Sequence, residues 1–236
     1  MLPLRDSPKP HRRPVVTLTL IGLCALAFVW ELFHGGQQLA VAFYKFGLVP
    51  ARYTRADVAR EFAWHFGPGG TLLPFLTSMF LHGSWLHLLG NLWMLWIFGD
   101  NVEDRLGHVR YLGLYLGSGF AAALVHVLTN MHSVVPTIGA SGAVAGIMGA
   151  YFRFFPHSRL DVAIPPFFLG PFFEIPAVLF LGFWFLLQFV QGTTSLGGYG
   201  QSHGGIAWWA HVGGFLFGLA MAALVREKPK VPPFLR

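Results

Sequence analysis

Long apolar stretches separated by short polar connectors dominate the sequence. A helix needs about 20 mostly apolar residues to cross the hydrocarbon core of a bilayer. The first such stretch, Val15–Phe33, carries a single charge, Glu31, near its end. The others are Ser84–Phe98, Tyr111–Thr129, Ala140–Phe155, Phe172–Gln191 and Ile206–Val225. The pattern therefore predicts an all-α membrane protein with six transmembrane helices.

The composition agrees with this class. Of the 236 residues, 54% are hydrophobic and 11% are charged, whereas soluble domains carry about 25% charged residues. This deficit excludes an ordinary soluble domain, a disordered chain and a nucleic-acid-binding domain. The net charge of +6 does not change that conclusion, because the basic residues gather at the chain ends and in connectors, as membrane proteins place them. The expected surroundings are a lipid bilayer, and no nucleic-acid partner is expected.

The distribution of Lys and Arg predicts the orientation. Twelve of the 16 basic residues fall on the side of the two chain ends. Because cytoplasmic loops are enriched in Lys and Arg, both termini are predicted to be cytoplasmic. The six helices would form one membrane domain, 15–226, with 34–82 as its first external loop and with cytoplasmic tails at 1–14 and 227–236. The charge and the short tails indicate a multi-pass integral protein of a prokaryotic plasma (inner) membrane.

Four polar residues within the predicted helices are candidates for function: His87, Asn91, Ser141 and His211. A polar side chain in the hydrocarbon region is costly, so it is a functional candidate by default. Each of them, taken alone, is explained at least as well by an interhelical hydrogen bond that stabilises the bundle. Their depth in the membrane separates these two interpretations.

The predicted depths favour one shared site. At 1.5 Å per residue, Asn91 lies roughly 10 Å and His211 roughly 8 Å below the outer ends of their helices. His87 is one turn above Asn91. The helix that begins at Ser141 spans only roughly 22 Å of an apolar core of about 30 Å, so its outer end starts below the surface. All four side chains are therefore expected at one level in the outer third of the membrane.

Small residues would allow the close approach that chemistry requires. They flank the candidate serine and follow the candidate histidine, at Gly139, Gly142, Gly146, Gly214 and Gly218. Such ribbons let helix backbones pack closely in lipid, and a serine–histidine pair needs roughly 2.6–3.2 Å between its reacting atoms. Ser141 is also predicted at a helix N-terminus, where free amides favour a developing oxyanion.

The segments around these residues resemble the rhomboid intramembrane serine proteases. Gly139-Ala140-Ser141-Gly142 is similar to the active-serine segment of that family, and Ala210-His211-Val212-Gly213-Gly214 is similar to its histidine helix. His87-Leu88-Leu89-Gly90-Asn91 matches the His-x-x-x-Asn oxyanion element. The segment 99–104, which contains Glu103, resembles a structural helix-end segment. The four motifs occur in order, and the resemblance covers about Leu73 to Val225.

The resemblance implies a serine endopeptidase that cleaves transmembrane segments of membrane proteins near the outer face. Ser141 would be the nucleophile and His211 the base, while the Ser141 amide and the side chains of His87 and Asn91 would hold the oxyanion. Structural roles would fall to Glu103, Gly139, Gly142, Gly214 and Gly218. No cofactor or metal is expected, and the oligomeric state stays open. Because the second, fourth and sixth helices contain no Asp or Glu, a Ser–His dyad is predicted rather than a triad.

Two features depart from the family pattern. Some members carry a Tyr four residues after the serine, stacked on the histidine, and this chain has Ala145 there. A Trp-x-Arg sequence is absent from the first loop. Both departures concern the surroundings of His211 and the loop, not the dyad.

Three alternatives accompany this interpretation. Ser118, between Gly117 and Gly119, is a rival nucleophile, but it lies in mid-helix without a histidine at its level and is interpreted as a packing residue. Eleven His residues allow a metal transporter, although His-Glu-x-x-His is absent and no carboxylate or thiolate shares their depth. A catalytically inactive rhomboid-like chaperone is the third. Such relatives lose the serine or the histidine, and both are present here.

Overall fold

The computed structural model describes residues 1–67, 72–163, 173–195 and 207–225. The predicted tail 227–236 lies outside these residues. The helices that correspond to the six predicted spans are α1 (Val15–Phe33), α6 (Trp85–Leu106), α7 (His108–Thr129), α8 (Ser141–Phe154), α9 (Ala177–Thr194) and α10 (Trp208–Ala223). The first long connector forms α2 (Gly36–Phe46), α3 (Ala51–Thr54), α4 (Ala56–Phe66), α5 (Leu73–Thr77) and the 3-10 turn η1 (Ser78–Phe80). Three strands complete the order: β1 (Leu2–Asp6), β2 (Arg159–Ala163) and β3 (Phe173–Pro176).

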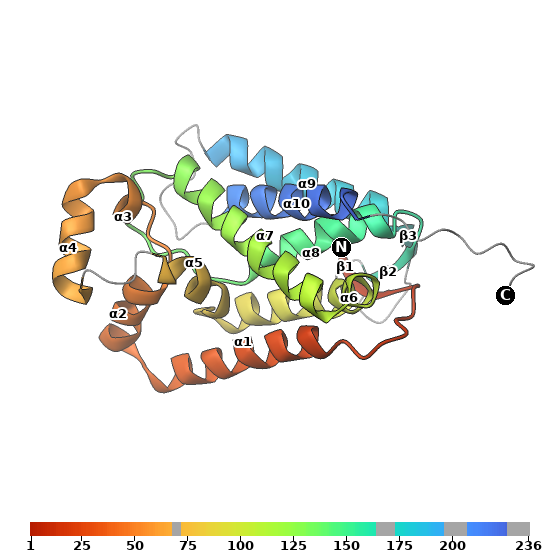
Figure 1. Ribbon diagram of the computed structural model, residues 1–236, viewed down its shortest axis with the longest axis horizontal. Coiled ribbons are helices and arrows are strands. Elements are labelled where there is room, and N and C mark those ends of the chain that lie inside the picture. Colours follow the sequence, from red (N-terminus) through yellow and green to blue (C-terminus); the bar gives the residue numbers. More distant parts are fainter. Residues whose placement is uncertain (68–71, 164–172, 196–206, 226–236) are drawn as a thin grey trace, which may run out of the picture.

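The long helices form a bundle along the longest axis of the molecule (Figure 1). Helices α2, α3 and α4 gather at one end of this bundle, and the strands lie at the opposite end. Among the described residues, three helices, α1, α7 and α9, are long and apolar enough to cross a membrane, and α10 is a shorter apolar helix. The chain is therefore a mostly helical integral membrane protein.

Helix α8 is the buried centre of the bundle. It has 14 residues, and every position from Gly142 to Tyr151 is buried. Its most extensive contacts are with α10 and α7. A helix surrounded on all faces must present little side-chain volume, which explains why Gly and Ala recur along it. The short fourth helix expected from the sequence is thus the core element, with Ser141 as its first residue.

Two buried carboxylates fix α1 to the rest of the bundle. Glu103, at the far end of α6 from His87, accepts hydrogen bonds at 2.8 Å from the backbone N–H groups of Val16 and Thr17. Glu31 accepts at 2.8 Å from the backbone N–H groups of His82 and Gly83. Buried charges persist when hydrogen bonds satisfy them. The one charged residue of the first apolar stretch therefore anchors the turn that leads into α6.

The expectation of an all-α protein misses a small sheet. Strands β1 and β2 pair antiparallel with Leu2 opposite Ala163, and β2 pairs antiparallel with β3. Part of the predicted N-terminal tail is therefore structured. The Nε1–H of Trp93 on α6 donates to the Pro3 carbonyl at 2.6 Å and ties β1 to the bundle. The prediction failed here because strands of four or five residues leave only a weak pattern, and their pairing joins segments far apart in the sequence.

The first connector is tied directly to the segment that precedes α8. Leu48 and Thr137 form an isolated antiparallel bridge, with N–O distances of 2.9 and 2.8 Å in its two hydrogen bonds. Gly139 N–H donates to the Ser78 carbonyl at 2.8 Å. The connector therefore holds the backbone that leads to Ser141 in place.

Candidate active site

Ser141 and His211 form a hydrogen-bonded pair in the bundle. The Nε2 atom of His211 lies 2.8 Å from Oγ of Ser141, although 70 positions separate them in the sequence. His211 is buried, with 8% of its surface exposed. This distance is within the range that a nucleophile and its general base require.

Glycine contacts between α8 and α10 bring the pair together. A Cβ atom at Gly214 would lie 2.0 Å from the carbonyl oxygen of Gly142. One turn further, a Cβ at Gly218 would lie 1.8 Å from the carbonyl oxygen of Gly146. Real Cβ atoms do not approach backbone oxygens so closely, so only glycine permits this separation of the helices. A larger residue at Gly214 or Gly218 would push α10 away from α8 and separate His211 from Ser141.

The second ring nitrogen of His211 has a partner that the sequence analysis missed. Nδ1 lies 2.8 Å from Oε1 of Gln188 on α9. The rings of Trp184 and Trp208 also lie beside His211, with centroid distances of 5.9 and 6.3 Å. Aromatic packing thus comes from α9 and the start of α10, while position 145 is a buried alanine. The available signal was a polar residue in an apolar helix, but Gln191 offers the same signal one turn later.

His87 faces the backbone that leads to Ser141. Its Nδ1 lies 2.8 Å from the His82 carbonyl oxygen, and a carbonyl can only accept, so Nδ1 carries a proton. Its Nε2 points at Gly139, where a Cβ atom would lie only 2.5 Å away. Gly139 has φ +125°, a left-handed conformation that favours glycine. His87 can therefore donate from Nε2 only when both ring nitrogens are protonated.

Asn91 lies one turn along α6 from His87. Its Nδ2 donates to the His87 carbonyl at 3.1 Å, so in this structure the amide is engaged within α6 and not at Ser141. Asn91 is buried, with 7% exposed. The structure thus brings Ser141 and His211 into hydrogen-bond contact. His87 lies beside the Gly139 backbone, and Asn91 lies one turn further along α6, where its amide contacts the His87 carbonyl.

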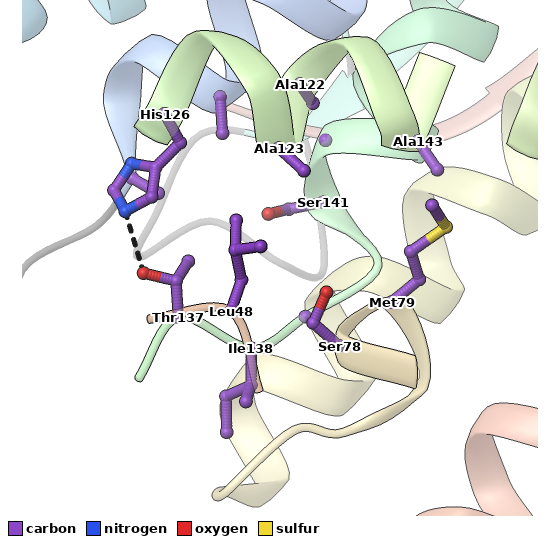
Figure 2. Close-up of a pocket in the computed structure, with 15 residues that line it drawn as sticks. Leu48, Ser78, Met79, Ala122, Ala123, His126, Thr137, Ile138, Ser141 and Ala143 are labelled. Atoms are coloured by element: carbon purple, nitrogen blue, oxygen red, sulfur yellow. Dashed lines mark hydrogen bonds between the residues drawn. The ribbon is translucent and has the colours of Figure 1, made fainter. Parts of the chain in front are cut away.

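A small pocket lies beside the serine hydroxyl. Figure 2 shows Ser141 pointing into it between Leu48 and the two alanines Ala122 and Ala123. Its volume of about 30 Å³ exceeds the roughly 10–15 Å³ that a single water requires. Polar groups in its wall come from Ser78 and from a His126–Thr137 pair, whose Nε2 and Oγ1 atoms are 2.8 Å apart.

The backbone at Ser141 adds donors to the site. Ser141 is the first residue of α8, and the first four N–H groups of a helix have no acceptor within it. The positive end of the helix dipole adds to their attraction for negative charge. The start of α8 can therefore stabilise negative charge that develops beside Ser141.

The rival nucleophile lies elsewhere. Ser118 on α7 is fully buried, and a Cβ at Gly146 would lie 2.0 Å from its Oγ. Among the described residues this hydroxyl has no hydrogen-bond partner. The same residues contain no group of three His, Cys, Asp or Glu side chains arranged to hold a metal ion.

The fold and this site define a helical integral membrane protein with a hydrogen-bonded serine–histidine pair, whose serine begins a helix. Residues 69–228 match the Rhomboid domain family. The chain therefore belongs to the rhomboid family, as its motifs suggested.

Individual relatives match over shorter segments. "Rhomboid protein 1, mitochondrial" of Saccharomyces cerevisiae is 33% identical over 93 residues, 38% of this chain and 27% of that protein. "Presenilin-associated rhomboid-like protein, mitochondrial" of Homo sapiens is 31% identical over 40% of this chain and 26% of its own length. "RHOMBOID-like protein 5" of Arabidopsis thaliana is 37% identical over 32% and 24%, respectively. The matches span about a quarter of each relative.

Proposed function

We propose that this protein is an intramembrane serine endopeptidase that cleaves transmembrane segments of membrane proteins with a Ser141–His211 dyad. The observation that carries the proposal is the 2.8 Å contact between His211 Nε2 and Ser141 Oγ, with the serine at the start of α8. Membership in a family of generally proteolytic proteins supports it.

In the proposed reaction, Ser141 Oγ attacks the carbonyl carbon of a substrate peptide bond while its proton moves to His211 Nε2. The C–N bond then breaks, and His211 returns the proton to the leaving amine. A water molecule then attacks the acyl-enzyme while His211 takes its proton. His211 returns this proton to Ser141 Oγ as the ester bond breaks, which releases the second product as a carboxylic acid. The pocket beside Ser141 has room for such a water, next to the polar groups of Ser78 and Thr137.

The oxyanion of the tetrahedral intermediate is assigned to the Ser141 backbone N–H and the side chains of His87 and Asn91. His87 Nε2 lies against Gly139, and because Nδ1 already donates to the His82 carbonyl, His87 takes part in this set as the imidazolium, with both ring nitrogens protonated. The Asn91 amide must turn away from the His87 carbonyl before it can donate, so we expect it to act when substrate is bound.

The first experiment is active-site labelling of the detergent-purified protein with a fluorophosphonate probe. Attack by Ser141 Oγ forms an O–P bond and releases fluoride. Wild-type protein and Ser118→Ala should be labelled, while Ser141→Ala and His211→Ala should be neither labelled nor active on a reporter transmembrane substrate. Labelling of Ser141→Ala, or activity that depends on Ser118, would refute the assignment. An unlabelled, inactive wild type would favour the chaperone alternative.

We further propose six membrane crossings with both termini cytoplasmic, the site opening outward, and a prokaryotic plasma membrane. The charge pattern supports the orientation, whereas the word mitochondrial in relatives' names favours a mitochondrial location.

With Cys24 replaced by Ala, Ser133→Cys should react with an impermeant thiol reagent outside intact cells, and Ser7→Cys should not. The reverse pattern would overturn the orientation, and fractionation of the native cell decides the membrane.

A further inference from the structure

Gln188 is a buried amide on α9 whose two ends contact different groups. Its Oε1 lies 2.8 Å from Nδ1 of His211, and its Nε2 donates to the backbone carbonyl of Trp184 at 3.3 Å. Only 6% of the residue is exposed. A neutral polar group in such a place is costly unless both of its ends are hydrogen-bonded, and here both are.

These contacts determine how the amide is oriented. The Trp184 carbonyl can only accept a hydrogen bond, so the NH2 group of Gln188 must face it. The amide oxygen then faces His211, and because this oxygen can only accept, Nδ1 of His211 must carry the proton. In a neutral imidazole the other nitrogen, Nε2, is then an acceptor. It is this nitrogen that lies 2.8 Å from the Ser141 hydroxyl.

We infer that Gln188 is the positioning residue of the dyad, and that it holds His211 in the tautomer that accepts the proton of Ser141. The inference rests on the proposed function and adds the group that orients the histidine where no acid is present. In hydrolases with a triad, a buried aspartate has this role. An amide does the same in the membrane without placing a second charge beside the ring, and its oxygen still accepts from Nδ1 when His211 becomes positively charged.

Side-chain packing alone does not explain this geometry. The rings of Trp184 and Trp208 restrict where the imidazole can lie, but an aromatic face does not choose between its two tautomers. Gln191, one turn along the same helix, has the same side chain and is exposed. It therefore provides a matched control for the loss of one amide from α9.

The test compares Gln188→Met, Gln188→Glu and Gln191→Met with wild type. Met has nearly the same length as Gln and lacks the acceptor, whereas Glu keeps an oxygen toward Nδ1 whether or not it is protonated. The measurements are the rate of fluorophosphonate labelling, kcat and KM on a reporter transmembrane substrate, and the thermal midpoint. The ¹⁵N chemical shifts of histidine-labelled protein, with His211→Ala to assign the signal, report the tautomer directly.

We expect Gln188→Met to lower kcat and the labelling rate by roughly 10–100-fold with KM unchanged. This is less than the roughly 10⁴-fold loss when a triad aspartate is replaced by an amide, because Met removes the tautomer preference and does not invert it. Gln188→Glu should restore most of the rate, Gln191→Met should behave as wild type, and the Nδ1-protonated signal should weaken only in Gln188→Met.

Two results would overturn the inference. One is a Gln188→Met protein with wild-type labelling and an unchanged tautomer. The other is equal loss in Gln188→Met and Gln188→Glu together with a lower thermal midpoint, since that is the behaviour of a packing residue. A wild-type protein that is not labelled would instead refute the proposed function, while the ¹⁵N measurement would still decide whether Gln188 fixes the tautomer.

Discussion

Gly218 of α10 packs directly on the backbone of Gly146 in α8. A Cβ atom at position 218 would lie 1.8 Å from the Gly146 carbonyl oxygen and 2.5 Å from its carbon. A backbone carbonyl cannot rotate away as a side chain can, so any larger residue must push the two helices apart. Since His211 lies on α10 and Ser141 on α8, the distance between His211 Nε2 and Ser141 Oγ depends on this contact.

Gly218→Ala should therefore destabilise the protein and impair the site together. Overpacking of a well-packed core costs about 1–3 kcal/mol and sometimes more, and we expect at least the upper end because the obstacle is backbone. The matched control is Gly113→Ala on α7, where a Cβ atom would meet nothing within 4 Å. Thermal midpoints in detergent should fall for Gly218→Ala and stay level or rise for Gly113→Ala. Equal midpoints would contradict the packing argument.

Glu103→Gln should lower stability without changing the chemistry of the folded protein. The Glu103 carboxylate accepts from Val16 N–H, from Thr17 N–H and from the Thr17 hydroxyl, which is 2.7 Å away. An amide turns one acceptor into a donor, and a buried donor left unsatisfied costs about 1–3 kcal/mol. The neighbouring Asp104, which accepts at the exposed N-terminal segment, supplies the control Asp104→Asn. If Glu103→Gln melted like Asp104→Asn, the buried anchor would be unimportant.

Asp6 should make stability depend on pH. Burial raises the pKa of the Asp6 carboxyl above its ordinary value of 3.8, although the hydrogen bond from Tyr151 opposes this. A raised pKa in the folded state means that Asp6 contributes stability below the ordinary value, and that this contribution is lost as pH rises through the raised value.

Asp6→Asn is the matching variant. It keeps an oxygen that can accept from the Tyr151 hydroxyl and the Asn101 amide, as one Asp6 oxygen does now at 2.6 and 2.9 Å. The thermal midpoint of wild type relative to Asp6→Asn should fall as the pH rises from the ordinary pKa of 3.8 through the raised pKa of the folded protein. Taking the difference removes the effect of those carboxylates that do not interact with Asp6. A difference that stays constant, or rises with pH, would show that burial of Asp6 has no such effect.

Much of the fold could be predicted from the sequence because a bilayer requires helices of about 20 mostly apolar residues, which are visible as apolar stretches. Apolar length predicts helices where α1, α6, α7, α8, α9 and α10 lie. The rise per residue predicts Ser141 and His211 at one level, and their side chains lie 2.8 Å apart. The predicted ends of α6 and α9, in the stretches Ser84–Phe98 and Phe172–Gln191, differ from those in the structure. Helix α6 continues through the polar residues that follow Phe98, and α9 begins only after Pro176. Hydropathy marks where a helix is apolar, not where it ends.

The missed features depend on contacts between distant segments. Gln188 and Gln191 are the same residue type in the same apolar helix, so the sequence does not distinguish them. The rotation of α9 about its own axis decides that Gln188 contacts His211. Similarly, β1 gains its partner from residues 159–163, and nothing in the five residues of β1 specifies that pairing. Such features become predictable only after the helices have been assembled.

His87 and Asn91 are proposed to stabilise the oxyanion, and this role predicts how their substitution affects turnover. Substitution of either residue by Ala should lower kcat and leave KM nearly unchanged, because hydrogen bonds that strengthen only in the transition state affect turnover and not binding. Removal of one such donor costs about 10²–10³-fold in a water-excluded site. We expect losses at or below the lower end, since the Ser141 amide remains and the pocket beside it admits water.

The competing explanation is that both residues only brace α6. His87 contacts the His82 carbonyl and Asn91 contacts the His87 carbonyl, so each stabilises the start of that helix. Under that explanation the thermal midpoint falls while kcat of the remaining folded protein stays normal. Leu89→Ala, at an exposed position between them, controls for a shortened side chain on α6. Measuring kcat and the thermal midpoint of all three variants therefore separates the roles. A lower kcat with an unchanged midpoint assigns the residue to the oxyanion, and the opposite result removes it from the site while leaving the dyad intact.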